Sequence, residues 1–149
     1  MDKKRRTSAK PVAKRWLRGT EITLRIIRRF VREIVERFAP DKIILFGSQA
    51  YGTPHEDSDV DILVVMPARN EIDQAVRICL AMEYNFSLDL IVRTPSNLAW
   101  RLAEGDWFLR EITSKGKVLY AKPNAGVDPE SRAGLGKRSK ARPRPSAGA

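Results

Sequence analysis

The sequence has few of the features that build a disulfide, a cysteine zinc site or a membrane span. The single cysteine, Cys79, excludes an internal disulfide and any zinc site made of several cysteines, and it fits a reducing compartment. The longest apolar run has five residues, whereas a membrane-spanning helix needs about 20. The basic stretch Lys3 to Arg6 is not followed by the apolar segment of a secretory signal. We therefore expect a cytoplasmic protein that does not enter membranes.

The net charge of +10 at pH 7 comes from the two ends of the chain. Residues 1–18 hold eight basic residues and one acidic residue, and residues 121–149 hold seven and two. The middle, residues 19–120, holds 13 basic and 15 acidic residues. Runs of this kind are usually solvated tails, and weak contact with RNA or DNA is the functional alternative.

Composition divides the 149 residues in the same way. Residues 121–149 are rich in Pro, Gly, Ser and charge and have little apolar surface to bury, which predicts a disordered basic tail. Residues 1–19 form a basic extension that is either disordered or contains a short helix after Pro11. Residues 20–120 are long enough for one compact domain.

Within this domain, the spacing of apolar residues predicts alternating helices and strands. Thr20 can cap a helix that Pro40 ends, and Asn70 can cap another. Strands are expected over residues 42–46, 60–66, 87–92 and 117–120, with a short helix near Gln49 and helical structure over residues 95–115. The predicted fold class is α/β (α+β), with a small mixed sheet flanked by helices.

The first candidate site is Gly47-Ser48, which directly follows the first predicted strand. A glycine lets a phosphate approach the backbone, free N–H groups at a helix start attract an anion, and the serine hydroxyl adds a donor. The same pair is more often a simple turn. A P-loop is excluded because Thr53-Pro54 stands where that motif needs Lys-Ser/Thr.

The second candidate site is Asp59-Val60-Asp61, at the start of the second strand. Alternation along a strand places both carboxylates on one side, roughly 6–7 Å apart along the chain. Like charges this close favour a counter-ion, and carboxylate oxygens suit Mg²⁺. Asp89 is a third carboxylate, within the apolar stretch Leu88 to Val92, where we expect it to be buried. If the two strands are neighbours, three carboxylates and a phosphate-binding turn form a two-metal site for phosphoryl or nucleotidyl transfer.

These residues reproduce a known signature. Gly47-Ser48, ten residues and then Asp59-Val60-Asp61 match Gly-Ser-x10-Asp-x-Asp, so the chain resembles the polymerase-β-like nucleotidyltransferases, and Asp89 falls where their third carboxylate sits. The resemblance covers about residues 41–120 and is closest to the minimal nucleotidyltransferases, whose ending is similar to residues 104–120 here. Bacterial members of that group often act as the antitoxin of a HEPN toxin.

The resemblance implies a role for each of these residues. Gly47 and Ser48 would hold the β- and γ-phosphates of ATP. Asp59 and Asp61 would bind two Mg²⁺ ions, and Asp89 would bind the catalytic ion and help to deprotonate the acceptor hydroxyl. The implied activity is EC 2.7.7, most specifically the transfer of AMP from ATP to a hydroxyl of a HEPN partner protein.

Two other functions remain open at this point: an antitoxin that acts by occlusion without catalysis, and a basic nucleic-acid-binding protein.

Three further features of the sequence are given structural interpretations. His55, the single histidine, is expected to be a solvated loop residue, and Cys79 a core residue. Trp100, Trp107 and Phe108 are expected to be core or partner contacts.

Overall fold

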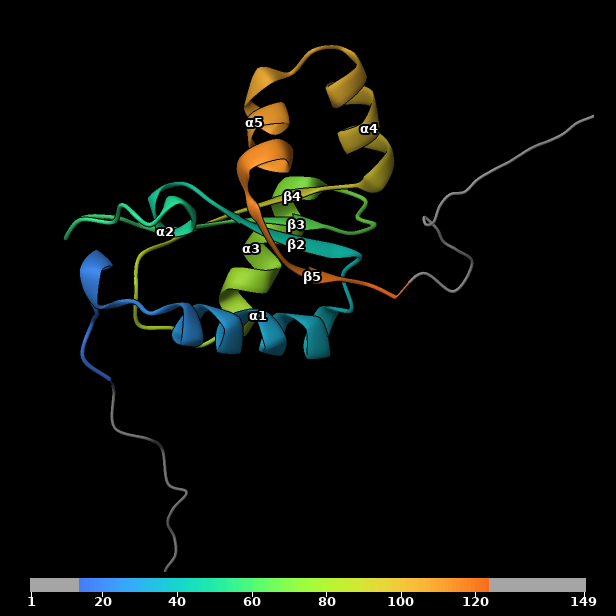
Figure 1. Cartoon of the computed structure of the whole chain (residues 1–149). Helices are drawn as coiled ribbons and strands as arrows, with labels where there is room; N and C mark the ends of the chain where they lie inside the picture. Colours follow the sequence, from blue (N-terminus) through green and yellow to red (C-terminus); the bar gives the residue numbers. More distant parts are fainter. Residues whose placement is uncertain (1–13, 124–149) are drawn as a thin grey trace, which may run out of the picture.

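The computed structural model describes residues 14–123 (Figure 1). Tails were expected over residues 1–19 and 121–149, and residues 1–13 and 124–149 of them lie outside the described part. The boundary at 121 is wrong by a few residues, because Ala121 is the last residue of a strand and the Lys122 N–H donates to the Asp41 carbonyl at 2.8 Å. In the described part, no helix is both long and apolar enough to cross a membrane.

A four-stranded mixed sheet forms the centre of the molecule. Its strands are β2 (Lys42–Phe46), β3 (Val60–Val65), β4 (Leu88–Arg93) and β5 (Lys117–Ala121), in the order β4-β3-β2-β5. Strand β2 is antiparallel to β3 and to β5, whereas β3 and β4 are parallel. The four predicted strands are therefore confirmed, with ends that shift by no more than one residue.

Helices cover both faces of this sheet, as the sequence predicted (Figure 1). Helices α1 (Leu24–Phe38) and α3 (Glu71–Ala81) lie on one face, and α4 (Pro95–Ala103) and α5 (Trp107–Lys115) on the other. Between α4 and α5 the chain turns at Gly105, with φ 91°, and Asp106 caps α5 by accepting the Leu109 N–H at 3.1 Å. Two short elements complete the domain, the 3₁₀ helix η1 (Gly19–Glu21) and helix α2 (Ser48–Tyr51).

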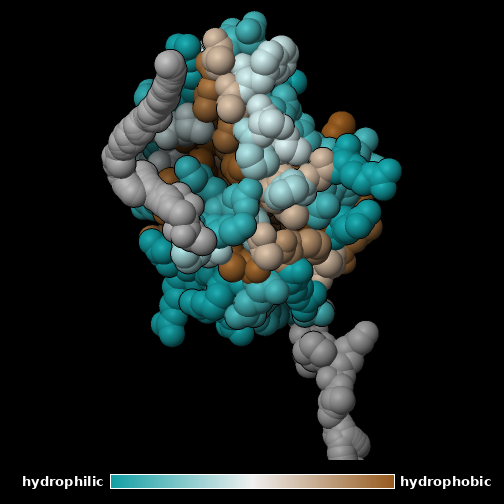
Figure 2. Space-filling model, turned by 90° about the vertical axis from the view of Figure 1, so that its right-hand side faces the viewer, coloured by the Kyte–Doolittle hydropathy of each residue, from teal (hydrophilic) through white to brown (hydrophobic). Residues whose placement is uncertain are grey.

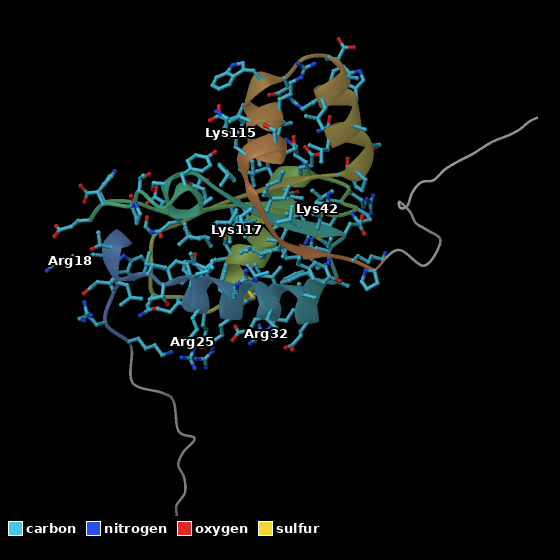
Figure 3. All side chains as sticks on the ribbon, viewed as in Figure 1. Arg18, Arg25, Arg32, Lys42, Lys115 and Lys117 are labelled. Carbon is cyan, nitrogen blue, oxygen red and sulfur yellow. The ribbon has the colours of Figure 1, made fainter. Side chains whose placement is uncertain are left out.

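Helix α1 is amphipathic, which fixes its orientation on the sheet. Its apolar side buries Ile27, Phe30 and Ile34, while arginines such as Arg25 and Arg32 point away from the sheet (Figure 3). The prediction that Thr20 caps this helix is wrong, because Thr20 belongs to η1. The cap is Thr23, whose Oγ1 accepts the Ile26 N–H at 3.2 Å. The helix ends before Pro40, as expected.

Alternating strand residues supply two hydrophobic cores, one on each face of the sheet. The core under α1 and α3 includes Ile43, Leu45, Ile62, Val64 and Val92. The smaller core, next to α5, consists of Ile44, Phe46, Leu63, Val65, Leu109 and Ile112. Hydrophobic surface also remains exposed, and Figure 2 shows it in brown in the upper part of the molecule, where α4 and α5 stand.

The chain joins the domain before Thr20, the boundary that composition indicated. The Leu17 N–H donates to the Asn85 carbonyl at 2.7 Å, and Asn85 Nδ2 donates to the Arg15 carbonyl at 2.6 Å. Residues 14–18 form no helix. Their hydrogen bonds tie this stretch to the loop before β4, so the last part of the N-terminal extension belongs to the folded unit.

Candidate active site

The strand register brings the three predicted carboxylates to one end of the sheet. Asp61 on β3 lies directly opposite Asp89 on the parallel neighbour β4, and Asp59 is two residues before Asp61. Asp61 shares its sheet face with Leu63 and Val65, so the site lies on the face that α4 and α5 cover farther along. As these side chains are placed, no three Asp, Glu, His or Cys groups among residues 14–123 already converge around a common metal position.

The expectation that Asp89 is buried is wrong. Asp89 is exposed, and Asp61 is the partly buried member of the group. The reason is the strand order: β4 is the outer strand of the sheet, whereas β3 has neighbours on both sides. The apolar residues around Asp89 bury their own side chains and leave the carboxylate at the edge.

Electrostatics single out Asp61. Burial, and then the charges of Asp89 and Asp59, raise the pKa of Asp61 from 3.8 to about 6. The ionised form is disfavoured because three carboxylates repel one another in a partly desolvated place. A divalent cation would remove that repulsion, and hard oxygen donors are the ligands that Mg²⁺ prefers. The chemistry of these carboxylates therefore suits Mg²⁺.

Gly47 connects the predicted phosphate-binding turn to these carboxylates. It follows Phe46, the residue of β2 that pairs with Asp61. Its φ is 75°, and a Cβ at this position would collide with the Asp61 carboxylate. Only glycine combines this backbone conformation with such a close approach. The structure thus places the Gly47-Ser48 turn in contact with the carboxylate group.

The hydroxyl of Ser48 takes part in a small polar network. Ser48 Oγ donates to Ser58 Oγ at 2.9 Å, and Ser58 Oγ accepts the His55 N–H at 2.8 Å. Ser58 is the buried polar residue of the described chain, with 6% of its surface exposed. Through these two hydrogen bonds, Ser58 holds the loop before Asp59 against the Gly47-Ser48 turn. No local pattern predicts this role, because Ser58 looks like any loop serine.

The N-terminal segment fixes the same loop from the other side. The Gly19 N–H donates to the Glu56 carbonyl at 2.8 Å, and Gln49 Nε2 donates to the Gly19 carbonyl at 2.8 Å. A Cβ at Gly19 would collide with the His55 carbonyl oxygen. Gly19 and Gln49 therefore position the loop and the short helix α2 relative to each other, a contact between distant segments that local patterns do not reveal.

The structure also shows how far the other residues singled out in the sequence are buried. His55 is exposed in the loop, as expected. Cys79 is partly buried, and burial followed by the charge of Asp89 raises the pKa of its thiol, which does not favour a nucleophile. Trp100 and Trp107 are not core residues, since they are 61% and 72% exposed. Phe108 is 44% exposed and packs its ring edge-on with Phe46, with centroids 5.9 Å apart.

Asp59 and Asp89 are exposed, and Asp61 is partly buried. Two shallow hollows of the described chain, of about 390 and 350 Å³, lie elsewhere. One is next to Glu71 and Thr94, and the other is between α1 and β5. An open site is accessible to an acceptor as large as a folded protein.

Known proteins are similar to this chain in sequence. Residues 24–120 match the family described as nucleotidyltransferase domain. Two proteins of Methanocaldococcus jannaschii, both provisionally named protein adenylyltransferases, are 32% and 34% identical to this chain over 99 and 98 residues. Each match covers 94% of the relative, and they cover 63% and 62% of this chain.

A solved structure is also similar. It is the crystal structure of a protein from Sulfolobus solfataricus that is provisionally described as a nucleotidyltransferase. The TM-score is 0.48 and the sequence identity 20%, and the match covers 67% of this chain and 81% of that one.

Proposed function

The chain belongs to the nucleotidyltransferase domain family, of the polymerase-β-like minimal type, and is a nucleotidyltransferase of EC class 2.7.7; from this premise we propose that it transfers AMP from ATP to a hydroxyl of a partner protein. The names of the two M. jannaschii relatives support a protein acceptor. The observation that carries the proposal is the register of Asp61 and Asp89 beside Gly47.

Each residue of the site has a task in this reaction. The turn at Gly47 and Ser48 binds the terminal phosphates of ATP, because the first N–H groups of α2 have no partner within the helix. Asp59, Asp61 and Asp89 would hold Mg²⁺, which supplies charge stabilisation at the phosphates and orients the reacting groups. Asp89 is exposed on the edge strand β4, and it accepts the proton of the acceptor hydroxyl.

The chemical step is a displacement at the α-phosphorus of ATP. The acceptor oxygen forms a bond to this phosphorus while the bond to the bridging oxygen of the β-phosphate breaks. Pyrophosphate leaves, AMP remains on the acceptor, and the hydroxyl proton goes to Asp89. ATP supplies both the AMP that is transferred and the pyrophosphate that leaves, so no oxidant or reductant is required.

The proposed acceptor is a protein. Residues 14–123 form one small domain, and the two M. jannaschii relatives, each covered to 94% by the match, are named as protein adenylyltransferases. We place the reaction in the cytoplasm and propose as acceptor a HEPN-type toxin, so that modification is the means by which this protein acts as an antitoxin.

The proposal is tested by labelling. A HEPN protein encoded next to this chain is incubated with it, with Mg²⁺, and with ATP labelled either at the α- or at the γ-phosphorus. We expect label on the partner from α-labelled ATP only, and none with Asp61→Asn or with EDTA. Binding and inhibition of the partner without any label, equal in wild type and Asp61→Asn, would show occlusion in place of transfer.

A further inference from the structure

The outer side of α3 carries an apolar stripe. Ile72, Val76 and Leu80 follow one another at intervals of four residues and are 76%, 50% and 82% exposed. The inner side of the same helix buries Ile78 in the core. Residues four apart lie on one side of a helix, so the three side chains form a continuous row. Such a row on a helix that is already packed on its other side marks an interaction surface.

We propose that this stripe pairs with the same stripe of a second copy, with the two α3 helices antiparallel and a two-fold axis at Val76. A two-fold interface must be complementary to itself. Ile72 lies four residues before Val76, and Leu80 lies four residues after it. Antiparallel pairing therefore places Ile72 of each copy against Leu80 of the other, with the two Val76 side chains in contact at the centre.

The charges beside the stripe are complementary under the same operation. Asp73 lies three residues before Val76 and Arg77 one residue after it, and both are exposed. Pairing about Val76 brings Asp73 of one copy within two residues, about 3 Å along the helix axis, of Arg77 of the second copy. The two Arg77 side chains lie equally close to each other along the axis, so the pairing brings two Asp73–Arg77 pairs of opposite charge together against one pair of like charge. Charge complementarity thus favours a second copy over an unrelated apolar partner.

The area of the stripe sets the strength of the association. Three apolar side chains with these exposures present on the order of 400 Å² on each copy, about half of the ~800 Å² per partner in a standard stable interface. We therefore expect a weak, reversible dimer.

The pairing leaves the carboxylate site free. Asp61 lies on the sheet face of Leu63 and Val65, whereas α3 packs against the opposite face, with Ile62 and Val64. A dimer through α3 therefore does not cover the site. Loss of the dimer leaves the catalytic residues unchanged, so the association can be tested separately from nucleotidyl transfer.

Val76→Glu is the central test, and the chain offers a matched control. Val118 on β5 has the same residue type and the same exposed fraction, 50%, at the far edge of the sheet. Sedimentation velocity of the full chain at about 1–300 µM should show a concentration-dependent dimer for wild type and for Val118→Glu. Val76→Glu should remain monomeric, because two carboxylates would meet at the axis. All three proteins should have similar melting temperatures.

A charge exchange tests the antiparallel arrangement itself. Asp73→Arg and Arg77→Asp each place like charges beside each other across the two-fold axis and should weaken the dimer several-fold. The double variant should restore it, and an equimolar mixture of the two single variants should form a mixed dimer.

Two results would overturn the proposal. One is a wild type that stays monomeric throughout the concentration range, which would assign the stripe to another partner. The other is a dimer that Val76→Glu leaves intact, which would place the contact elsewhere.

Discussion

Replacement of Asp61 by asparagine should abolish transfer and yet stabilise the metal-free protein. Asp61 is the carboxylate whose pKa is raised to about 6, from 3.8, by burial and by the charges of Asp89 and Asp59. A raised pKa in the folded state means that folding favours the protonated carboxyl. Stability from this group is present at low pH and is lost as the pH rises from about 4 to about 6. At pH 8 the wild type therefore carries the full repulsion, whereas Asp61→Asn does not.

The size of the effect follows from the shift. A change of about two pKa units corresponds to at most ~3 kcal/mol, at 1.36 kcal/mol per unit. Asp61 is only partly buried, so solvent screens much of this interaction and about 1 kcal/mol remains. For a domain of roughly 100 residues, this free energy raises the melting temperature by about 4–6 °C.

Thermal melts followed by circular dichroism measure this difference. In EDTA at pH 8, Asp61→Asn should melt above the wild type, and at pH 3.5 the two should coincide because both side chains are then mostly neutral. Addition of Mg²⁺ at pH 8 should stabilise the wild type and have little effect on the variant. The reasoning is refuted if Asp61→Asn melts below the wild type at both pH values, since the carboxylate would then serve the fold.

Three further substitutions test the remaining parts of the site. Asp89→Asn should stay within about 0.5 kcal/mol of wild-type stability, because Asp89 is exposed, while single-turnover transfer is lost; unchanged turnover would remove Asp89 from the site. Gly47→Ala should lower both the melting temperature and the transfer rate, because the methyl group collides with the Asp61 carboxylate at a positive φ; a normal rate would contradict the assigned contact. Ser58→Ala should cost about 1–3 kcal/mol in urea unfolding, because the His55 N–H loses its acceptor; an unchanged free energy of unfolding would mean that water replaces the hydroxyl.

The sequence determined those parts of the protein that depend on neighbouring residues. The run from Lys42 to Phe46 is too apolar to face water, so it forms a strand. Asp61 lies on β3, and Gly47, Ser48 and Asp59 lie in the connection between the adjacent antiparallel strands β2 and β3, so their spacing along the chain carries most of their geometry. For this reason a short signature was sufficient to indicate the family and to predict candidate residues for the site.

Tertiary structure decided what depends on distant segments. Whether Asp89 is buried depends on the place of β4 in the strand order, and the edge position leaves it exposed despite its apolar neighbours. Ser58 and Gly19 acquired their roles from contacts with Ser48 and the His55 loop, which no local pattern encodes. The exposure of Ile72 and Leu80 likewise depends on which side of α3 meets the sheet. In each case the deciding quantity is the set of atoms that covers a residue, and that set is fixed only when the strands and helices pack together.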